Sequence, residues 1–187
     1  MLVRAGALHH DIGKLAIPIF FIENQNTGFN PHNELSYEES AQTIISHVTN
    51  GIKLAYKHSL PEPIIDFIRT HHGTSKTKYF YNRYVAENPD KPIDSTIFTY
   101  KGPRPFSRET AVVMMVDAVE AASRSLKNHS ESEISKLVDN IINSQIEDEQ
   151  FSNSDITFKD VDKIKDLLKK KLQSIYHVRI EYEITKK

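Results

Sequence analysis

Histidines and aspartates occur in this chain at apolar positions where a helix surface would not ordinarily place them. The stretch "ALHHDIGKL" at 7–15 sets two histidines and an aspartate between apolar residues. The pattern recurs in "IISHVTNGI", at the end of "IIDFIRTHH" and within "AVVMMVDAVEAA". Burying such groups without partners is costly, so they need hydrogen bonds, opposite charges or a metal. The six candidate residues are His10, Asp11, His47, His71, His72 and Asp117.

Histidine and carboxylate ligands without thiolates are typical of iron, manganese or zinc in hydrolytic centres. Each residue alone has a simpler interpretation: a lone histidine is more often a hydrogen-bonded core residue, and a core arginine is an alternative partner for Asp117. The joint pattern favours a metal, because the groups fall on four separate helices. Neighbouring residues point about 100° apart on a helix, so His71 and His72 can serve one centre only near a helix end. Gly73 predicts that end.

The composition is that of an ordinary folded domain. The 187 residues suffice for a single domain over 1–187, and 39% hydrophobic with 26% charged residues argue against disorder. A net charge of −1 gives no electrostatic footprint for nucleic acid, so no nucleic-acid partner is predicted. Cysteine is absent, which removes disulfides, zinc–thiolate sites and thiol nucleophiles. No apolar run approaches the roughly 18 residues of a spanning helix, so we expect this stretch to be soluble.

The elements that must position these residues are helical almost throughout, and the predicted fold class is all-α. One helix is predicted to end near 10, and others are predicted over 39–58, 63–73, 76–88, 107–126, 132–147 and 158–177. Ser36 with Glu39 predicts a capping box, and Ser130 and Thr157 predict two further helix starts.

The remaining segments are less regular. Residues 88–106 hold four prolines and no helical period, so they are predicted to form a long loop, with a lid role because it leads into the helix of Asp117. Residues 178–184, "VRIEYEI", alternate like a strand. In the last helix the predicted buried stripe consists of Val161, Ile164, Leu167, Leu168 and Ile175. The Lys169–Lys171 run is predicted to be its solvated face.

The motifs in this order resemble the HD-domain metal-dependent phosphohydrolase superfamily. The stretches that carry the resemblance are "HHDIGK", "IISHVTNGIKLA", "HHGTSKTKYFYNR" and "VDAVEAASRSL". The flanking "FFIENQNTGFNPHNELS", "GPRP" and "IYHVRIEYE" narrow it to the C-terminal HD domain of the seven-transmembrane HD family, the PgpH-type cyclic di-AMP phosphodiesterases of bacteria. The resemblance covers essentially the whole chain. It implies an HD-domain helical bundle that is an N-terminally truncated part of a longer membrane-tethered protein, on the cytoplasmic side of a bacterial inner membrane.

The resemblance also implies two metal sites, with iron or manganese as the cofactor. The ligands carried over to the first site are His10, Asp11 and Asp117, and those of the second are Asp11, His47, His71 and His72. The family's first site takes a further histidine from an upstream helix, which has no counterpart in this chain. We therefore expect the first site to bind its metal less tightly and turnover to be reduced.

The implied activity is hydrolysis of a cyclic dinucleotide, cyclic di-AMP first, by a hydroxide that two metal ions generate from water. The predicted catalytic residues are Asp11 and Lys14; a solvent-facing lysine at a helix end is the alternative for Lys14. Arg124 is predicted to meet a second phosphate, unless it forms a core salt bridge. Tyr79 and Tyr81 are predicted to stack on a nucleobase, unless they are helix core. The alternative functions are hydrolysis of nucleotide mono- or triphosphates, and a nucleotide-binding sensor domain without turnover.

Overall fold

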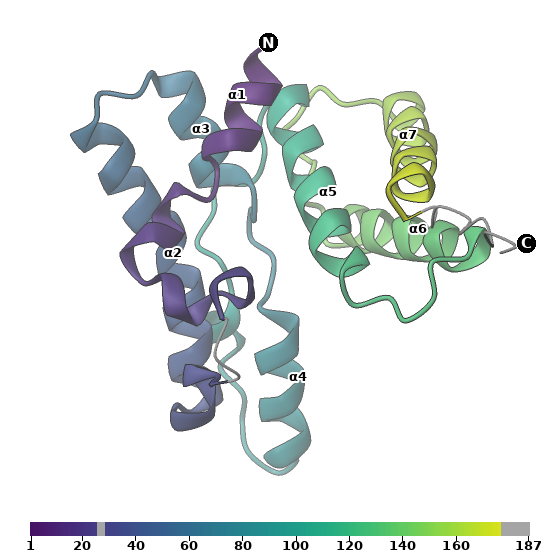
Figure 1. Ribbon diagram of the computed structural model, residues 1–187. Helices are drawn as coiled ribbons and strands as arrows, with labels where there is room; N and C mark the ends of the chain where they lie inside the picture. Colours follow the sequence, from purple (N-terminus) through teal and green to yellow (C-terminus); the bar gives the residue numbers. More distant parts are fainter. Residues whose placement is uncertain (26–28, 177–187) are drawn as a thin grey trace, which may run out of the picture.

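The computed structural model describes residues 1–25 and 29–176 (Figure 1). Its regular elements are all helices, joined by turns and loops. The α-helices are α1 (Leu2–His9), α2 (Tyr37–Lys57), α3 (Glu62–Thr70), α4 (Lys78–Glu87), α5 (Arg108–Ser123), α6 (Glu131–Glu147) and α7 (Phe158–Tyr176). The 3₁₀ helices are η1 (Ile12–Ala16), η2 (Pro18–Phe20), η3 (Ile22–Asn24), η4 (Pro31–Glu34) and η5 (Ser95–Phe98). The all-α prediction is confirmed; the strand predicted over 178–184 lies outside the described residues.

Side-chain caps begin two of the helices that carry site residues, α2 and α5. At α2, Ser36 accepts a hydrogen bond from the backbone N–H of Glu39, and the Glu39 carboxylate accepts one from the N–H of Ser36. Ser107 and Thr110 make the same reciprocal pair at the start of α5. Each box satisfies two N–H groups that a helix start otherwise leaves without partners.

Replacing Ser107 by alanine is expected to lower the free energy of unfolding by about 1 kcal/mol, because the N–H of Thr110 loses its acceptor. Thermal or urea unfolding measures the change. The control is Ser174→Ala, at an exposed position inside α7, where alanine favours the helix slightly. Equal stability of the two variants would contradict a capping role for Ser107.

Helix α5 lies between two groups of helices, with α1 to α4 on one side and α6 and α7 on the other (Figure 1). The largest apolar cluster joins α5, α6 and α7, and its buried members include Met114, Met115, Val119, Ile134, Val138 and Ile142. A smaller cluster joins α2 and α3 through Ala55, Ile65 and Ile68. Asp117 therefore lies on a helix that is packed on both sides.

The stripe predicted on α7 is partly wrong. Val161 is buried and Leu172 completes the buried face, whereas Leu167 and Ile175 are exposed. The apolar face is narrower than the sequence pattern suggests, because α7 contacts its neighbours along one side only. Lys169 at the edge of this face forms an ion pair with Asp139, with its Nζ 2.7 Å from the carboxylate.

The proline-rich segment 88–106 includes η5 and is fastened to the chain that follows α3. Lys76 and Thr99 form an isolated antiparallel bridge, and the N–H of Tyr100 donates to the carbonyl of Ser75 over 2.9 Å. Gly73 has a φ of +51°, in the region that favours glycine, at the turn after α3. Within the described residues, no helix combines the length and apolar character needed to cross a membrane.

Candidate metal centre

Four helices bring the six predicted residues to one place. His10 is the C-cap of α1 and Asp11 follows it at once, so both side chains stand at a helix end. His71 is the C-cap of α3 and His72 follows in the same way. His47 comes from the middle of α2 and Asp117 from α5. Because each adjacent pair stands at the end of a helix, both of its side chains can point into one site, as the sequence predicts.

Asp11 is the centre of this arrangement. Its Oδ2 lies 3.2 Å from Nε2 of His10, and its Oδ1 lies 3.4 Å from Nε2 of His47 and 3.6 Å from Nε2 of His71. On one side, Nε2 of His10 is also 3.3 Å from Oδ1 of Asp117. On the other side, His72 completes a group of three imidazoles whose ligand atoms lie within 4.8 Å of one another. The carboxylate thus faces two groups at once.

Three of the histidines are oriented in the same way. Nδ1 of His10 lies 2.9 Å from the carbonyl of Ala7, Nδ1 of His47 lies 2.6 Å from that of Ile44, and Nδ1 of His71 lies 2.9 Å from that of Ile68. In each case the carbonyl is three residues earlier in the chain. A carbonyl oxygen can only accept, so each Nδ1 carries a proton, and Nε2 is bare whenever the ring is neutral. This is the orientation that metal-ligating histidines take from their surroundings.

The Nε2 atoms of these three rings face each other and the carboxylates. Their distances show whether a cation fits among them. Nε2 of His47 and Nε2 of His71 are only 3.0 Å apart, although both lack a proton in this tautomer. Nε2 of His10 faces Oδ2 of Asp11 and Oδ1 of Asp117. Lone pairs that converge at these distances repel unless a proton or a metal ion lies among them. The donor set, nitrogen and oxygen without sulfur, fits a divalent transition metal.

The charges around the two groups differ. Burial by itself lowers the pKa of His10, but the hydrogen bonds and charges of Asp11 and Asp117 outweigh it and raise that pKa to about 10. Burial, together with the neighbouring His71, lowers the pKa of His47 to about 4, and the same causes lower the pKa of His72. At neutral pH His47 and His72 are therefore neutral imidazoles, the form that binds metals.

Lys14 and Asp11 form an ion pair beside the centre. Nζ of Lys14 lies 2.8 Å from Oδ2 of Asp11 and 2.7 Å from Oε1 of Glu23. Burial by itself raises the pKa of Asp11, but the neighbouring His10 and His71 rings and the charge of Lys14 hold it well below its usual range. The structure therefore places Lys14 at the site rather than in solvent, and Glu23 is a second anchor that the sequence analysis did not identify.

Arg124 lies at the end of α5 and is half-exposed. Its Nε donates to Oε1 of Glu120 over 2.9 Å on the same helix, so the core salt bridge considered from the sequence is wrong. That hydrogen bond raises the pKa of Arg124, and the charge of Glu23 adds a smaller effect.

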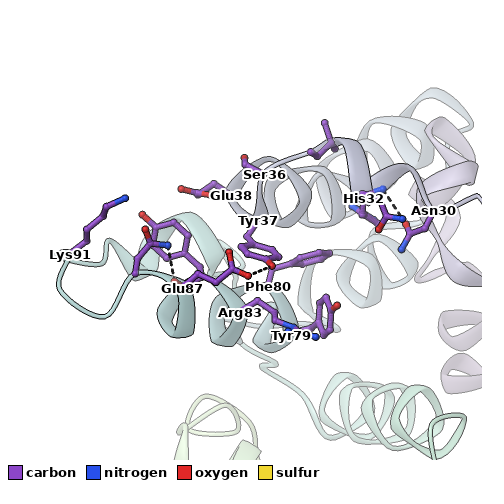
Figure 2. Close-up of a pocket in the computed structure, with 14 residues that line it drawn as sticks. Asn30, His32, Ser36, Tyr37, Glu38, Tyr79, Phe80, Arg83, Glu87 and Lys91 are labelled. Atoms are coloured by element: carbon purple, nitrogen blue, oxygen red, sulfur yellow. Dashed lines mark hydrogen bonds between the residues drawn. The ribbon is translucent and has the colours of Figure 1, made fainter.

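The two tyrosines predicted to stack on a base lie in different surroundings. Tyr79 is 65% exposed and lines a groove of about 910 Å³ between the start of α2 and α4, with Arg83 near its ring (Figure 2). Tyr81 instead packs against Phe98 and lies beneath the ammonium of Lys76. The two side chains cannot both face one base, because residues two positions apart on a helix point to nearly opposite sides of it. None of the six candidate ligands lines this groove.

Two aromatic residues of the site were missed by the sequence analysis. The Tyr100 ring stacks on His72, with ring centroids 4.1 Å apart and an angle of 24° between the planes. Phe21 is buried and packs edge-on against His47. Both lie in loop segments whose apolar pattern has no helical period, so no sequence signal connects them with histidines on α2 and α3.

Comparisons with known proteins find relatives along nearly the whole chain. A family model described as "HD domain" matches residues 1–122, which span all six candidate ligands. Curated proteins named "Cyclic-di-AMP phosphodiesterase PgpH" from Bacillus subtilis (strain 168) and Listeria monocytogenes serotype 1/2a (strain 10403S) are 44% and 41% identical over 100% and 97% of this chain. The chain spans only about a quarter of their length, 26% and 25%.

Solved structures give the same relationship. The HD domain of the L. monocytogenes phosphodiesterase PgpH in complex with cyclic-di-AMP has a TM-score of 0.89 and 40% sequence identity to this chain, covering 94% of this chain and 81% of that one. The same domain in a second structure has a TM-score of 0.87. The family model matches more than half of the residues and the solved domain matches nearly all of them, so the chain belongs to the HD domain family, as its motifs predict.

Proposed function

We propose that this domain is the catalytic part of a metal-dependent cyclic di-AMP phosphodiesterase. The observation that carries the proposal is the position of Asp11 between two groups of ligands. In this proposal one metal ion is held by His10, Asp11 and Asp117, and the other by Asp11, His47, His71 and His72. We propose iron or manganese as the metal, since imidazole and carboxylate ligands suit both.

Two bound cations at such a centre lower the pKa of water and neutralise charge on phosphate oxygens. The protein's own part is orientation. The Ala7, Ile44 and Ile68 carbonyls fix three imidazoles, and Asp11 joins the two groups. Lys14 is proposed to contact a phosphate oxygen, and its ion pairs with Asp11 and Glu23 support a place near the site. Arg124 is proposed for the second phosphate, and Tyr79 for contact with a base.

The proposed reaction adds one water to a cyclic dinucleotide. The new bond forms between the water oxygen and phosphorus, and the bond from phosphorus to the 3′-oxygen breaks. The 3′-oxygen takes up a proton, and the product is a linear dinucleotide with a 5′-phosphate. The names of the relatives and the bound cyclic-di-AMP in the Listeria domain support this substrate. Their length supports the further proposal that the domain works within a longer protein, and the resemblance of its motifs to the seven-transmembrane HD family supports membrane tethering.

A substrate panel tests the proposal. The metal-loaded protein is incubated with cyclic di-AMP, cyclic di-GMP, and nucleotide mono- and triphosphates, and products are separated by chromatography. We expect the linear dinucleotide from cyclic di-AMP at the highest rate. Faster release of phosphate from a mono- or triphosphate would favour the other phosphohydrolase activity. Tight binding of cyclic di-AMP without turnover, in a protein that holds both metals, would favour the sensor function.

Metal content tests the two ligand groups separately. We expect Asp117→Ala to lose the metal of the first group and His47→Ala that of the second, so that each variant retains about one ion of two when measured by elemental analysis. The first group offers three protein ligands and the second offers four, so a chelator should remove the first group's metal earlier. The control is His58→Ala, an exposed histidine outside the site. Equal metal content in the wild type and all three variants would show that Asp117 and His47 are structural residues and not metal ligands.

A further inference from the structure

His72 lacks the feature that orients the other three histidines of the centre. In the part of the chain that the structure describes, neither of its ring nitrogens has a hydrogen-bond partner, whereas His10, His47 and His71 each donate from Nδ1 to a backbone carbonyl. A ligand without such a partner is free to rotate about its side-chain bonds, which lowers its affinity for a metal. The orientation of the His72 ring must therefore come from a different contact.

Among the described residues, the ring that stacks nearly parallel on His72 is that of Tyr100. The two rings are stacked nearly parallel, with centroids 4.1 Å apart, while the His71 ring meets His72 at 45°. Tyr100 is only 7% exposed and also packs edge-on against His47, with centroids 6.1 Å apart. Stacking also becomes stronger when the imidazole carries positive charge, because the electron-rich face of tyrosine attracts a cation. Coordination to a divalent metal draws electron density from the imidazole and polarises it in the same sense.

Contacts with two segments of the chain hold Tyr100 beside His72. The N–H of Tyr100 donates to the carbonyl of Ser75, only three residues after His72, and the adjacent Thr99 pairs with Lys76. The ring itself packs against Ile45 and Val48 on α2, in the turns next to His47. Tyr100 is therefore tied to the segment that carries His72 and to the helix that carries His47.

We propose that Tyr100 is a positioning residue that orients His72 for metal binding, taking the place of the backbone carbonyl that orients the other histidines. This inference rests on the metal centre of the proposed function. It assigns the role to the aromatic face of Tyr100, and it gives the proline-rich segment 88–106 a structural part in the site. It also distinguishes His72 from His71, although the two are adjacent in the chain.

The test compares Tyr100→Phe with Tyr100→Leu. Zinc, which is diamagnetic, is the probe, and its affinity is measured by competition with a chromophoric chelator. We expect phenylalanine to retain the affinity and leucine to weaken the second group by about 10- to 100-fold, the range for loss of a residue that orients a ligand. In NMR spectra of the metal-free protein, the ring current of an aromatic residue 100 should shift the His72 ring protons upfield in wild type and Tyr100→Phe, but not in Tyr100→Leu.

Tyr176 provides a matched control, because it stacks on His129 with centroids 3.8 Å apart and an angle of 23° away from the centre. Tyr176→Leu should lower stability without changing zinc affinity. Unchanged affinity in Tyr100→Leu, or equal weakening in Tyr100→Phe, would overturn the inference. An unshifted His72 signal in folded wild-type protein would overturn it even if the leucine variant does not fold. Absence of zinc binding by wild type would instead contradict the proposed function.

Discussion

Asp11→Asn is expected to remove both metals at once and to lower phosphodiesterase turnover by at least about 10³-fold, which corresponds to about 4 kcal/mol of transition-state stabilisation. The reason is geometric: one carboxylate faces His10 through Oδ2 and His47 and His71 through Oδ1. Asparagine has nearly the same shape, but it brings no negative charge and presents an NH₂ group to a bare imidazole nitrogen. Loss of the charge also leaves Lys14 with Glu23 as its remaining ionic partner.

Asp66→Asn is the matched control for this prediction. The Asp66 side chain is 27% exposed, close to the 30% of Asp11, and it also pairs with a cation, Arg69, three residues later. We expect that variant to keep both metals and full turnover. The measurements are metal content by elemental analysis and the initial rate of cyclic di-AMP hydrolysis. An Asp11→Asn protein that retains two metals would show that the carboxylate does not join the two groups.

Features that depend on local sequence were predictable. A capping serine and its partner lie within three residues of each other, so the starts of α2 and α6 could be predicted from side-chain chemistry alone. The convergence of the ligands followed from residue type, since a buried carboxylate such as Asp117 requires partners wherever the helices place it. The turn at Gly73 followed from the need to end α3 beside two adjacent ligands.

Features that depend on contacts between distant segments were not predictable. Nothing in the sequence connects Lys14 with Glu23, or His72 with Tyr100, because those pairs form only when loops return to the site. The orientation of Tyr81 away from the groove likewise depends on Phe98, which approaches from the proline-rich segment. Periodicity shows which side of a helix is apolar, but it does not show how much of that side a neighbour covers, which is why Leu167 is exposed.

Gly13→Ala is expected to destabilise the fold by about 3 kcal/mol, roughly 6–12 °C in Tm for a domain of this size, and to weaken both metal sites. A Cβ at position 13 would lie 1.8 Å from the carbonyl oxygen of His47 and 2.4 Å from the backbone nitrogen of Gly51. Both are backbone atoms of α2, which cannot rotate away. The 3₁₀ helix η1 would have to move off α2, and it carries Lys14 and adjoins Asp11.

Gly51→Ala is the control for Gly13→Ala, because Gly51 lies on the other side of the same contact between η1 and α2. A Cβ at position 51 would first meet Cγ2 of Ile68 at 2.8 Å, the end of a side chain that can adjust, and then the backbone nitrogen of Gly13 at 3.2 Å. Alanine also favours the interior of α2 by about 1 kcal/mol over glycine, which offsets part of the clash. We therefore expect Gly51→Ala to have a clearly higher Tm than Gly13→Ala and to retain both metals. The reverse order of stability, measured by thermal unfolding of the metal-free proteins, would show that the close approach of η1 to α2 does not fix Asp11 opposite His47.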